Sequence, residues 1–214
     1  MNTPHHKAFV FSRYSGGYTL AELLASIAVL TVILVAIYAF EANVFVYNNE
    51  IQTQITNAWQ AESVLSTMAK EIRTMVPSGN GSYPIASVSS TSITFFSNVD
   101  SDTAAEEVKY FYSTSTNTLY RGVIQPSGNP PVYTGSETDN VLVNGVRASS
   151  TLPLFQYFDG YYEGTSSPLN VGNLSISSIR LVRINLTVDT DVNRSPLPIT
   201  YTTSVSIRNL KSNL

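Results

Sequence analysis

The sequence contains no cysteine and only two histidines, His5 and His6, both near its start. Without cysteine there is no disulfide framework, no thiolate nucleophile and no zinc site with sulfur ligands. Beyond position 6 the chain has no imidazole for a serine triad or a histidine-ligated zinc site. Phosphate-binding glycine motifs are also missing. We therefore expect a protein that is not an enzyme and that is stabilised by packing alone.

Charge is also scarce. Charged residues make up 13% of the chain, about half the usual share of roughly 25%. The formal net charge of −3 argues against a general nucleic-acid-binding surface. Hydrophobic residues make up 43% of the chain, which is ordinary for a folded protein. The length of 214 residues is enough for one substantial domain and an appendage.

A long stretch without charge, proline or glycine covers residues 23–40 and reads LLASIAVLTVILVAIYAF. As a helix it would be about 27 Å long, enough to span a bilayer. Lys7 and Arg13 precede it and the next basic residue is Lys70, so the positive-inside rule places the N-terminus in the cytoplasm and the C-terminal part outside. A cleaved signal peptide is the simpler alternative, but its apolar region usually has about 7–15 residues and ends at an A-x-A-like site, which AIYAFEA matches poorly.

The helical pattern continues beyond the apolar stretch. Neither glycine nor proline occurs between Tyr18 and Val76, and Pro77 with Gly79 gives the first stop signal. Apolar residues recur at spacings of three, four or seven, which indicates one stripe on a helix. They are Val44, Ile51, Ile55, Ala58, Leu65, Met68, Ile72 and Met75. We predict one helix over residues 18–76, apolar at 18–43 for a membrane or filament core and amphipathic at 44–76.

Glu22 is a carboxylate at the start of the apolar run. In the centre of a bilayer a carboxylate costs about 3 kcal/mol, and less near the boundary. Glu22 is therefore either a boundary residue that reaches the interface or the partner of a cation. Cleavage before Tyr18 would supply such a cation, because the new α-ammonium would lie close to Glu22 and within reach of the Glu22 of a neighbouring copy.

Residues 17–24 read GYTLAELL and resemble the class III signal of type IV pilins and type II secretion pseudopilins. That signal is a glycine followed by F-T-L-x-E and an apolar helix, and Tyr18 here replaces the usual phenylalanine. The resemblance implies that a prepilin peptidase removes a leader, residues 1–17, by cleaving between Gly17 and Tyr18, and that Tyr18 is N-methylated. Thr19 and Leu20 complete the motif.

The same resemblance assigns a role in filament assembly to Glu22, which corresponds to the glutamate that pairs with the N-terminal amine of an adjacent subunit. It also implies the partners: other pilins or pseudopilins, the prepilin peptidase and an inner-membrane assembly platform. The mature protein would be a single-pass protein of the cytoplasmic membrane and then part of an extracellular or periplasmic filament.

The segment AESVLSTMAKEIRTMV, residues 61–76, resembles the end of the helix in PilW-type minor pilins and the J-type minor pseudopilin, and the order of the later strands is similar. This resemblance implies a bacterial minor pilin or pseudopilin that initiates or caps a type IV pilus-like filament. An alternative is a filament-anchored binding module for DNA uptake or adhesion.

After residue 77 the pattern is that of a β-rich head. Runs of Ile, Val, Thr, Tyr and Phe alternate with Ser, Asn, Gly and Asp breaks, which predicts strands. The seven predicted strands are 92–98, 107–113, 118–123, 140–146, 154–157, 179–189 and 199–208. We expect one antiparallel sheet whose apolar face, including Val182, Ile184 and Val205, is covered by the amphipathic helix. The predicted fold is α+β and pilin-like, with the head at residues 77–214.

Two acidic turns are the weak candidates for metal binding. Asp189, Asp191 and Asn193 open like a calcium loop, but Arg194 and Thr200 stand where an EF-hand needs glycine and glutamate. Asp100 and Asp102, with Glu106 and Glu107, form a second oxygen-rich turn. Exposed carboxylates are usually only solvated, so we favour polar turns, with calcium as the alternative and no other cofactor.

Two further clusters could bind a ligand. The stretch PLFQYFDGYYEG, residues 153–164, is either a stacking or adhesive patch or, as we favour, core residues followed by a tyrosine-rich turn. A basic cluster near the C-terminus could contact DNA; it consists of Arg180, Arg183, Arg194, Arg208 and Lys211. Loss of Lys7 and Arg13 with the leader would take the net charge from −3 to −5, which disfavours DNA as a partner.

Overall fold

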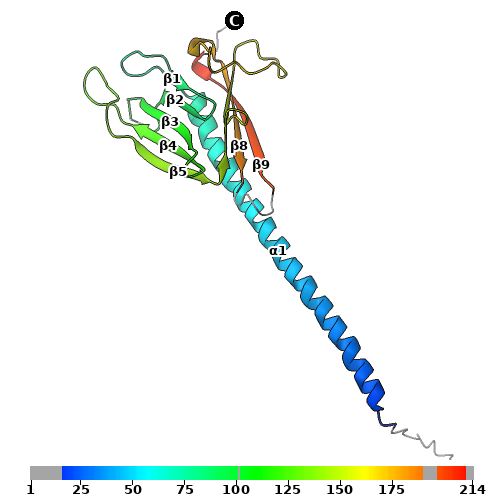
Figure 1. Cartoon of the computed structure of the whole chain (residues 1–214). Coiled ribbons are helices and arrows are strands. Elements are labelled where there is room, and N and C mark those ends of the chain that lie inside the picture. The colour runs from blue at the N-terminus through cyan, green and yellow to red at the C-terminus, as the bar shows by residue number, and fades with distance from the viewer. Residues whose placement is uncertain (1–15, 101, 190–196, 211–214) are drawn as a thin grey trace, which may run out of the picture. The chain divides into compact units, whose positions relative to one another are not determined.

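The computed structural model of the chain describes residues 16–100, 102–189 and 197–210. The chain divides into two compact units, Met1–Asn49 and Glu50–Leu214. The long helix α1 (Leu20–Arg73) contributes to both, and the strands belong to the second unit (Figure 1). Of the predicted leader, residues 1–15 lie outside the described part.

Helix α1 is the helix expected from the sequence, with slightly shorter ends. Thr19 precedes its first residue, and the predicted end at residue 76 is three residues too late. Lys70 and Arg73 lie in the last turn, where basic side chains interact favourably with the helix dipole. Val76 has left the helix, because its N–H donates to the carbonyl oxygen of Phe96 at 2.9 Å and Pro77 follows.

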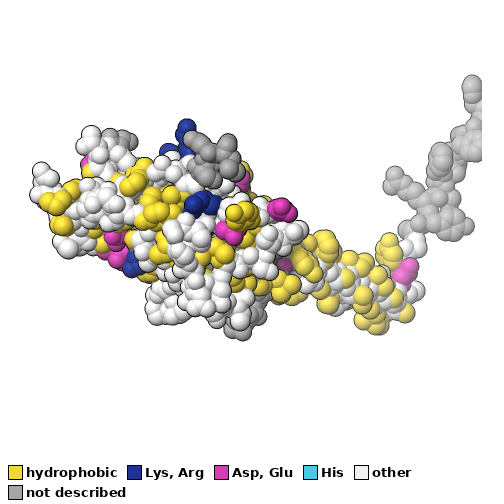
Figure 2. Space-filling model, turned by 90° about the horizontal axis from the view of Figure 1, so that it is seen from above, with side chains coloured by type: hydrophobic (Ala, Val, Ile, Leu, Met, Phe, Trp, Pro, Cys, Tyr) yellow, Lys and Arg dark blue, Asp and Glu magenta, His cyan; other side chains and the backbone are white. Residues whose placement is uncertain are grey.

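In the first unit the side chains of α1 are exposed, and most of them are apolar. Leu20, Leu30, Ile37 and Phe40 are examples, and the helix is long and apolar enough to cross a membrane. Figure 2 shows hydrophobic side chains over most of this segment on the face in view. A helix that is apolar all round requires apolar surroundings, either lipid or other helices.

The strands form two antiparallel sheets, which corrects the prediction of one. The first sheet has the order β1-β2-β3-β4-β5; in the second, β8 pairs with β6 and β7 along one edge and with β9 along the other. The strand bounds are β1 (Ile85–Val88), β2 (Ser92–Ser97), β3 (Glu106–Ser113), β4 (Thr118–Ile124), β5 (Thr138–Asn144), β6 (Val146–Arg147), β7 (Phe155–Phe158), β8 (Leu181–Val188) and β9 (Ile199–Ser206). Two 3-10 helices, η1 (Ile176–Ser178) and η2 (Arg208–Leu210), flank β8 and β9.

The change of sheet occurs at Gly145. The sequence predicts a single strand over 140–146, but Gly145 has a φ of 68°, a left-handed conformation that breaks the strand. β5 therefore ends at Asn144 in the first sheet, and β6 starts at Val146 in the second. Strand β1 was not predicted, because it is only four residues long and follows Pro84.

The second half of α1 shares one hydrophobic core with both sheets. Met68 and Ile72 are fully buried and belong to the same cluster as Phe95 of β2 and Leu186 of β8. The predicted stripe is therefore buried from Leu65 onward, and Ala61 and Val64, which were not predicted to belong to it, are buried as well. Its earlier members Ile51 and Ile55 are 54% and 46% exposed, so the head covers less of the helix than the sequence predicts.

The predicted alternation in β8 and β9 is confirmed. Val182, Ile184 and Leu186 are buried, and so are Val188, Val205 and Ile207. Ile179, in the predicted strand 179–189, is also fully buried. It lies just before β8, at the end of η1, where strand alternation does not yet apply.

Replacing Ile72 by alanine should lower the free energy of unfolding of the head by about 2–5 kcal/mol, because it leaves a cavity in a closed core. Ile55→Ala removes the same atoms from a half-exposed site on the same helix and should cost less than about 1 kcal/mol. Urea denaturation of the detergent-solubilised full chain measures both. Equal losses would contradict the assigned core.

Candidate functional site

The residues of the predicted cleavage site precede α1. Gly17 and Tyr18 are exposed and non-helical, and no atom lies within 4 Å of the position where a Cβ on Gly17 would be. Tyr18 exposes 84% of its surface. The bond between the two residues is therefore accessible in the described chain.

Thr19 caps the N-terminus of α1. The backbone N–H of Glu22 donates to Thr19 Oγ1 at 3.3 Å, and the N–H of Leu23 donates to the Thr19 carbonyl oxygen at 3.2 Å. The T-x-x-E spacing is that of a capping box, and a carboxylate in the first turn interacts favourably with the helix dipole. The sequence prediction treated Glu22 as a boundary residue or as the partner of a cation and did not include capping, although the T-x-x-E spacing was visible in the sequence.

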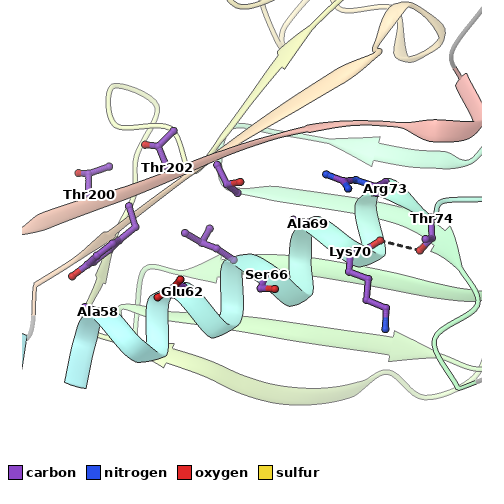
Figure 3. A pocket seen from close by; sticks show the side chains of 12 residues that line it. Ala58, Glu62, Ser66, Ala69, Lys70, Arg73, Thr74, Thr200 and Thr202 are labelled. Atoms are coloured by element: carbon purple, nitrogen blue, oxygen red, sulfur yellow. Dashed lines mark hydrogen bonds between the residues drawn. The ribbon is translucent and has the colours of Figure 1, made fainter. Parts of the chain in front are cut away.

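A groove runs between α1 and β9 (Figure 3). Its volume is ≈ 830 Å³, and Glu62, Ser66, Lys70 and Arg73 of α1 line one wall. Residues 200–203 of β9, three threonines and Tyr201, line the other. The sequence prediction did not find this groove, because it depends on how a helix and a strand more than 120 residues apart are placed.

The backbone of β9 is unpaired along one edge within the described residues. The N–H of Ile207 donates to the carbonyl oxygen of Arg180 at 3.0 Å. In an antiparallel pair every second residue forms backbone hydrogen bonds with the opposite strand, so counting back from Ile207 the odd-numbered residues of β9 bond to β8. The N–H and C=O groups of Thr200 and Thr202 therefore point away from β8. An unpaired edge of this kind is a place where a further strand can pair.

The acidic turn between β2 and β3 brings three carboxylates together. Oxygen atoms of Asp100, Asp102 and Glu106 lie within 4.8 Å of one another. Asp100 and Asp102 are exposed, whereas Glu106 is fully buried at the start of β3. The prediction included Glu107 in this turn, but successive residues of a strand point to opposite faces, and Glu107 lies instead near Glu137 and Lys109.

The second acidic turn is only partly described. Asp189 is buried and forms an ion pair with Arg147 at 2.6 Å, a partner that the sequence did not indicate. Asp191, Asn193 and Arg194 lie outside the described residues. Since Arg147 already balances the charge of Asp189, the described half of this turn favours a structural ion pair.

Glu71, on the last turns of α1, joins the helix to the first sheet. Its Oε2 accepts from the Tyr110 hydroxyl at 2.5 Å and from Arg121 Nε at 3.1 Å, and its Oε1 accepts from Arg121 Nη2 at 2.8 Å. Burial, followed by the negative charge of Glu71, raises the pKa of Tyr110, which keeps its hydroxyl a donor. The cluster is a polar lock between α1, β3 and β4.

The aromatic stretch at residues 153–164 and two arginines of the predicted basic cluster, Arg180 and Arg183, make contacts within the head. Phe155, Tyr157 and Phe158 are buried, while Tyr161 is exposed, as expected for core residues followed by a turn. The guanidinium of Arg183 lies over the Phe158 ring, 4.9 Å from its centroid. Arg180 donates to the carbonyl oxygens of Ser177 and Ile179. Arg194 and Lys211, the other members of the predicted basic cluster apart from Arg208, lie outside the described residues.

No protein-family model matches the chain, and no curated protein or solved structure matches it significantly.

Replacing Arg121 by methionine should lower the free energy of unfolding by about 3 kcal/mol, because it leaves the largely buried Glu71 carboxylate without its cation. Lys109→Met breaks the more exposed pair with Glu137, at 3.4 Å, and should cost no more than about 1 kcal/mol. Both variants are compared by urea denaturation of the full chain. Similar effects would show that Glu71 and Arg121 do not form the lock.

Proposed function

We propose that the chain is a minor pilin or pseudopilin that initiates or caps a type IV pilus-like filament after processing by a prepilin peptidase. The observation that carries this proposal is the composition of α1. Its exposed N-terminal part is apolar and has a carboxylate, Glu22, in its first turn, and its second part enters the core of a β-rich head.

Before assembly, the apolar part of α1 lies in the cytoplasmic membrane with its N-terminus inside. Two of the polar side chains in this part are already satisfied within the helix. Ser26 Oγ donates to the Glu22 carbonyl oxygen and Thr31 Oγ1 to that of Ile27, both at 2.8 Å. A helix of this kind presents few unpaired polar groups to lipid. Lys7 and Arg13 favour the orientation with the N-terminus in the cytoplasm.

The peptidase cleaves between Gly17 and Tyr18 at the cytoplasmic face and N-methylates Tyr18. The exposure of both residues and their position before the helix support this step. Cleavage removes the two basic residues of the leader and leaves a single positive charge, the α-ammonium of Tyr18, at the start of the apolar segment.

Glu22 then directs docking. An unpaired carboxylate in the hydrocarbon region costs up to about 3 kcal/mol, and the ammonium of an adjacent subunit offsets this cost. Because the attraction is strong only where water is excluded, the pair forms when two apolar helices lie side by side. Charge pairing thereby fixes the register of packing that is otherwise nonspecific.

The head places the subunit at or near a filament end. A head of two sheets needs space that is free at the tip, and the resemblance of residues 61–76 to PilW-type and J-type minor subunits supports the same position. The lock of Glu71 with Tyr110 and Arg121 keeps the head fixed on the second part of α1.

Glu22→Gln separates the docking role of Glu22 from its capping role, because glutamine also serves at this position of a capping box but carries no charge. We expect this variant to be inserted and processed normally. Its amount in filaments sheared from cells should fall about tenfold or more, since tenfold corresponds to only about 1.4 kcal/mol of docking free energy. Immunoblots of the sheared and membrane fractions measure both steps.

Glu41→Gln is the matched control, because it makes the same chemical change on the exposed surface of the same helix, about five turns away. It should assemble like the unaltered chain. Normal filament levels for Glu22→Gln would refute the pairing of Glu22 with the ammonium, and equal loss in both variants would show that any carboxylate on this helix is required.

A further inference from the structure

Glu106 has a buried carboxylate oxygen with no hydrogen-bond partner in the described part of the chain. The side chain is fully buried, and its Oε2 accepts from the backbone N–H of Val99 at 2.8 Å. Its Oε1 is closed off from solvent and has no hydrogen-bond donor among the described residues. Buried polar atoms are nearly always paired, because an unpaired one loses its hydration without replacement. Either a proton or a bound cation is therefore expected at this oxygen.

The surroundings of Glu106 favour a cation. Oxygens of Asp100 and Asp102 lie within 4.8 Å of Glu106 and of each other. Calcium binds oxygen at about 2.3–2.6 Å, so ligand oxygens on opposite sides of one ion are about 5 Å apart. The three carboxylates are thus close enough to contact a single ion.

The two aspartates are held in place before any ion binds. Asp100 Oδ2 accepts from Gln125 Nε2 at 3.1 Å, which ties the turn to the residue that follows β4. Asp102 Oδ1 accepts from the N–H of Ala104 at 2.7 Å. The Tyr133 hydroxyl donates to the carbonyl oxygen of Ala105 at 2.8 Å, next to Glu106. Little ordering is therefore needed on binding.

No basic side chain of the described residues forms an ion pair with Asp100, Asp102 or Glu106. The ion pairs among the described residues join other groups, Lys109 with Glu137, Arg121 with Glu71 and Arg147 with Asp189. A divalent cation would offset the negative charge of these three carboxylates.

We propose that Asp100, Asp102 and Glu106 bind one calcium ion, which fastens the turn between β2 and β3 to the edge of the core. Oxygen-only ligands select hard cations, and the absence of nitrogen and sulfur ligands disfavours zinc and copper. Calcium tolerates irregular geometry and completes its shell with carbonyl oxygens and water, whereas magnesium requires a near-octahedral site. This site does not depend on the proposed role in a filament.

Isothermal titration calorimetry of the full chain in detergent, after removal of divalent cations, tests the proposal. We expect one Ca²⁺ per chain with a Kd of about 10⁻³ M or tighter, as in extracellular modules, and a higher thermal unfolding midpoint with Ca²⁺. Glu106→Gln keeps the size of the side chain and an acceptor for the Val99 N–H, and it should weaken Ca²⁺ binding about tenfold or more. Glu107→Gln, one residue away on the other face of β3, should bind like the unaltered chain.

If Glu106→Gln fails to fold, the double variant Asp100→Asn/Asp102→Asn gives the same test, because both side chains are exposed. It should fold and lose the Ca²⁺ response. An unaltered chain that shows neither heat nor a midpoint shift up to about 10 mM Ca²⁺ would overturn the proposal and assign a proton to Glu106 Oε1. Preferential uptake of Zn²⁺, or unchanged binding in Glu106→Gln or in the double variant, would overturn it as well.

Discussion

Burial of one face of α1 under two sheets is the interaction on which the head depends. Each sheet has an apolar face that must be covered, and Met68 and Ile72 lie in one core with residues of both. The lock between Glu71 and Arg121 adds a fixed orientation, because a bidentate pair in a nearly closed site tolerates little displacement. None of the described residues covers the same helix in the first unit, where apolar side chains remain exposed.

The sequence was sufficient for elements in which burial follows a simple period. The helix and the alternation of Val182, Ile184 and Leu186 were predicted correctly, since each is a repeating pattern of apolar residues on one face. The number of sheets was not predictable in this way, because the switch depends on the backbone conformation of Gly145. How far the head covers α1 also depends on tertiary packing, as the exposure of Ile55 shows.

The same contrast between local patterns and tertiary packing applies to the candidate sites. The capping of α1 by Thr19 was not predicted, although it could have been read from the local spacing T-x-x-E. Partners from distant strands could not be found from the sequence, and Arg121 for Glu71 and Arg147 for Asp189 are examples. Burial of a single side chain also could not be predicted from the sequence. Glu106 and Glu107 are adjacent, and only the structure shows that Glu106 has a buried oxygen without a hydrogen-bond partner among the described residues.

The proposed filament role depends on a new amino terminus at Tyr18 next to a carboxylate in apolar surroundings. Intact-mass spectrometry of the protein extracted from membranes of cells with an active prepilin peptidase tests this most directly. The account predicts a chain that starts at Tyr18, lacks residues 1–17 and carries one methyl group on its terminal nitrogen. A chain that retains the first seventeen residues, or that has been cut after the apolar segment as a signal peptide would be, would contradict it.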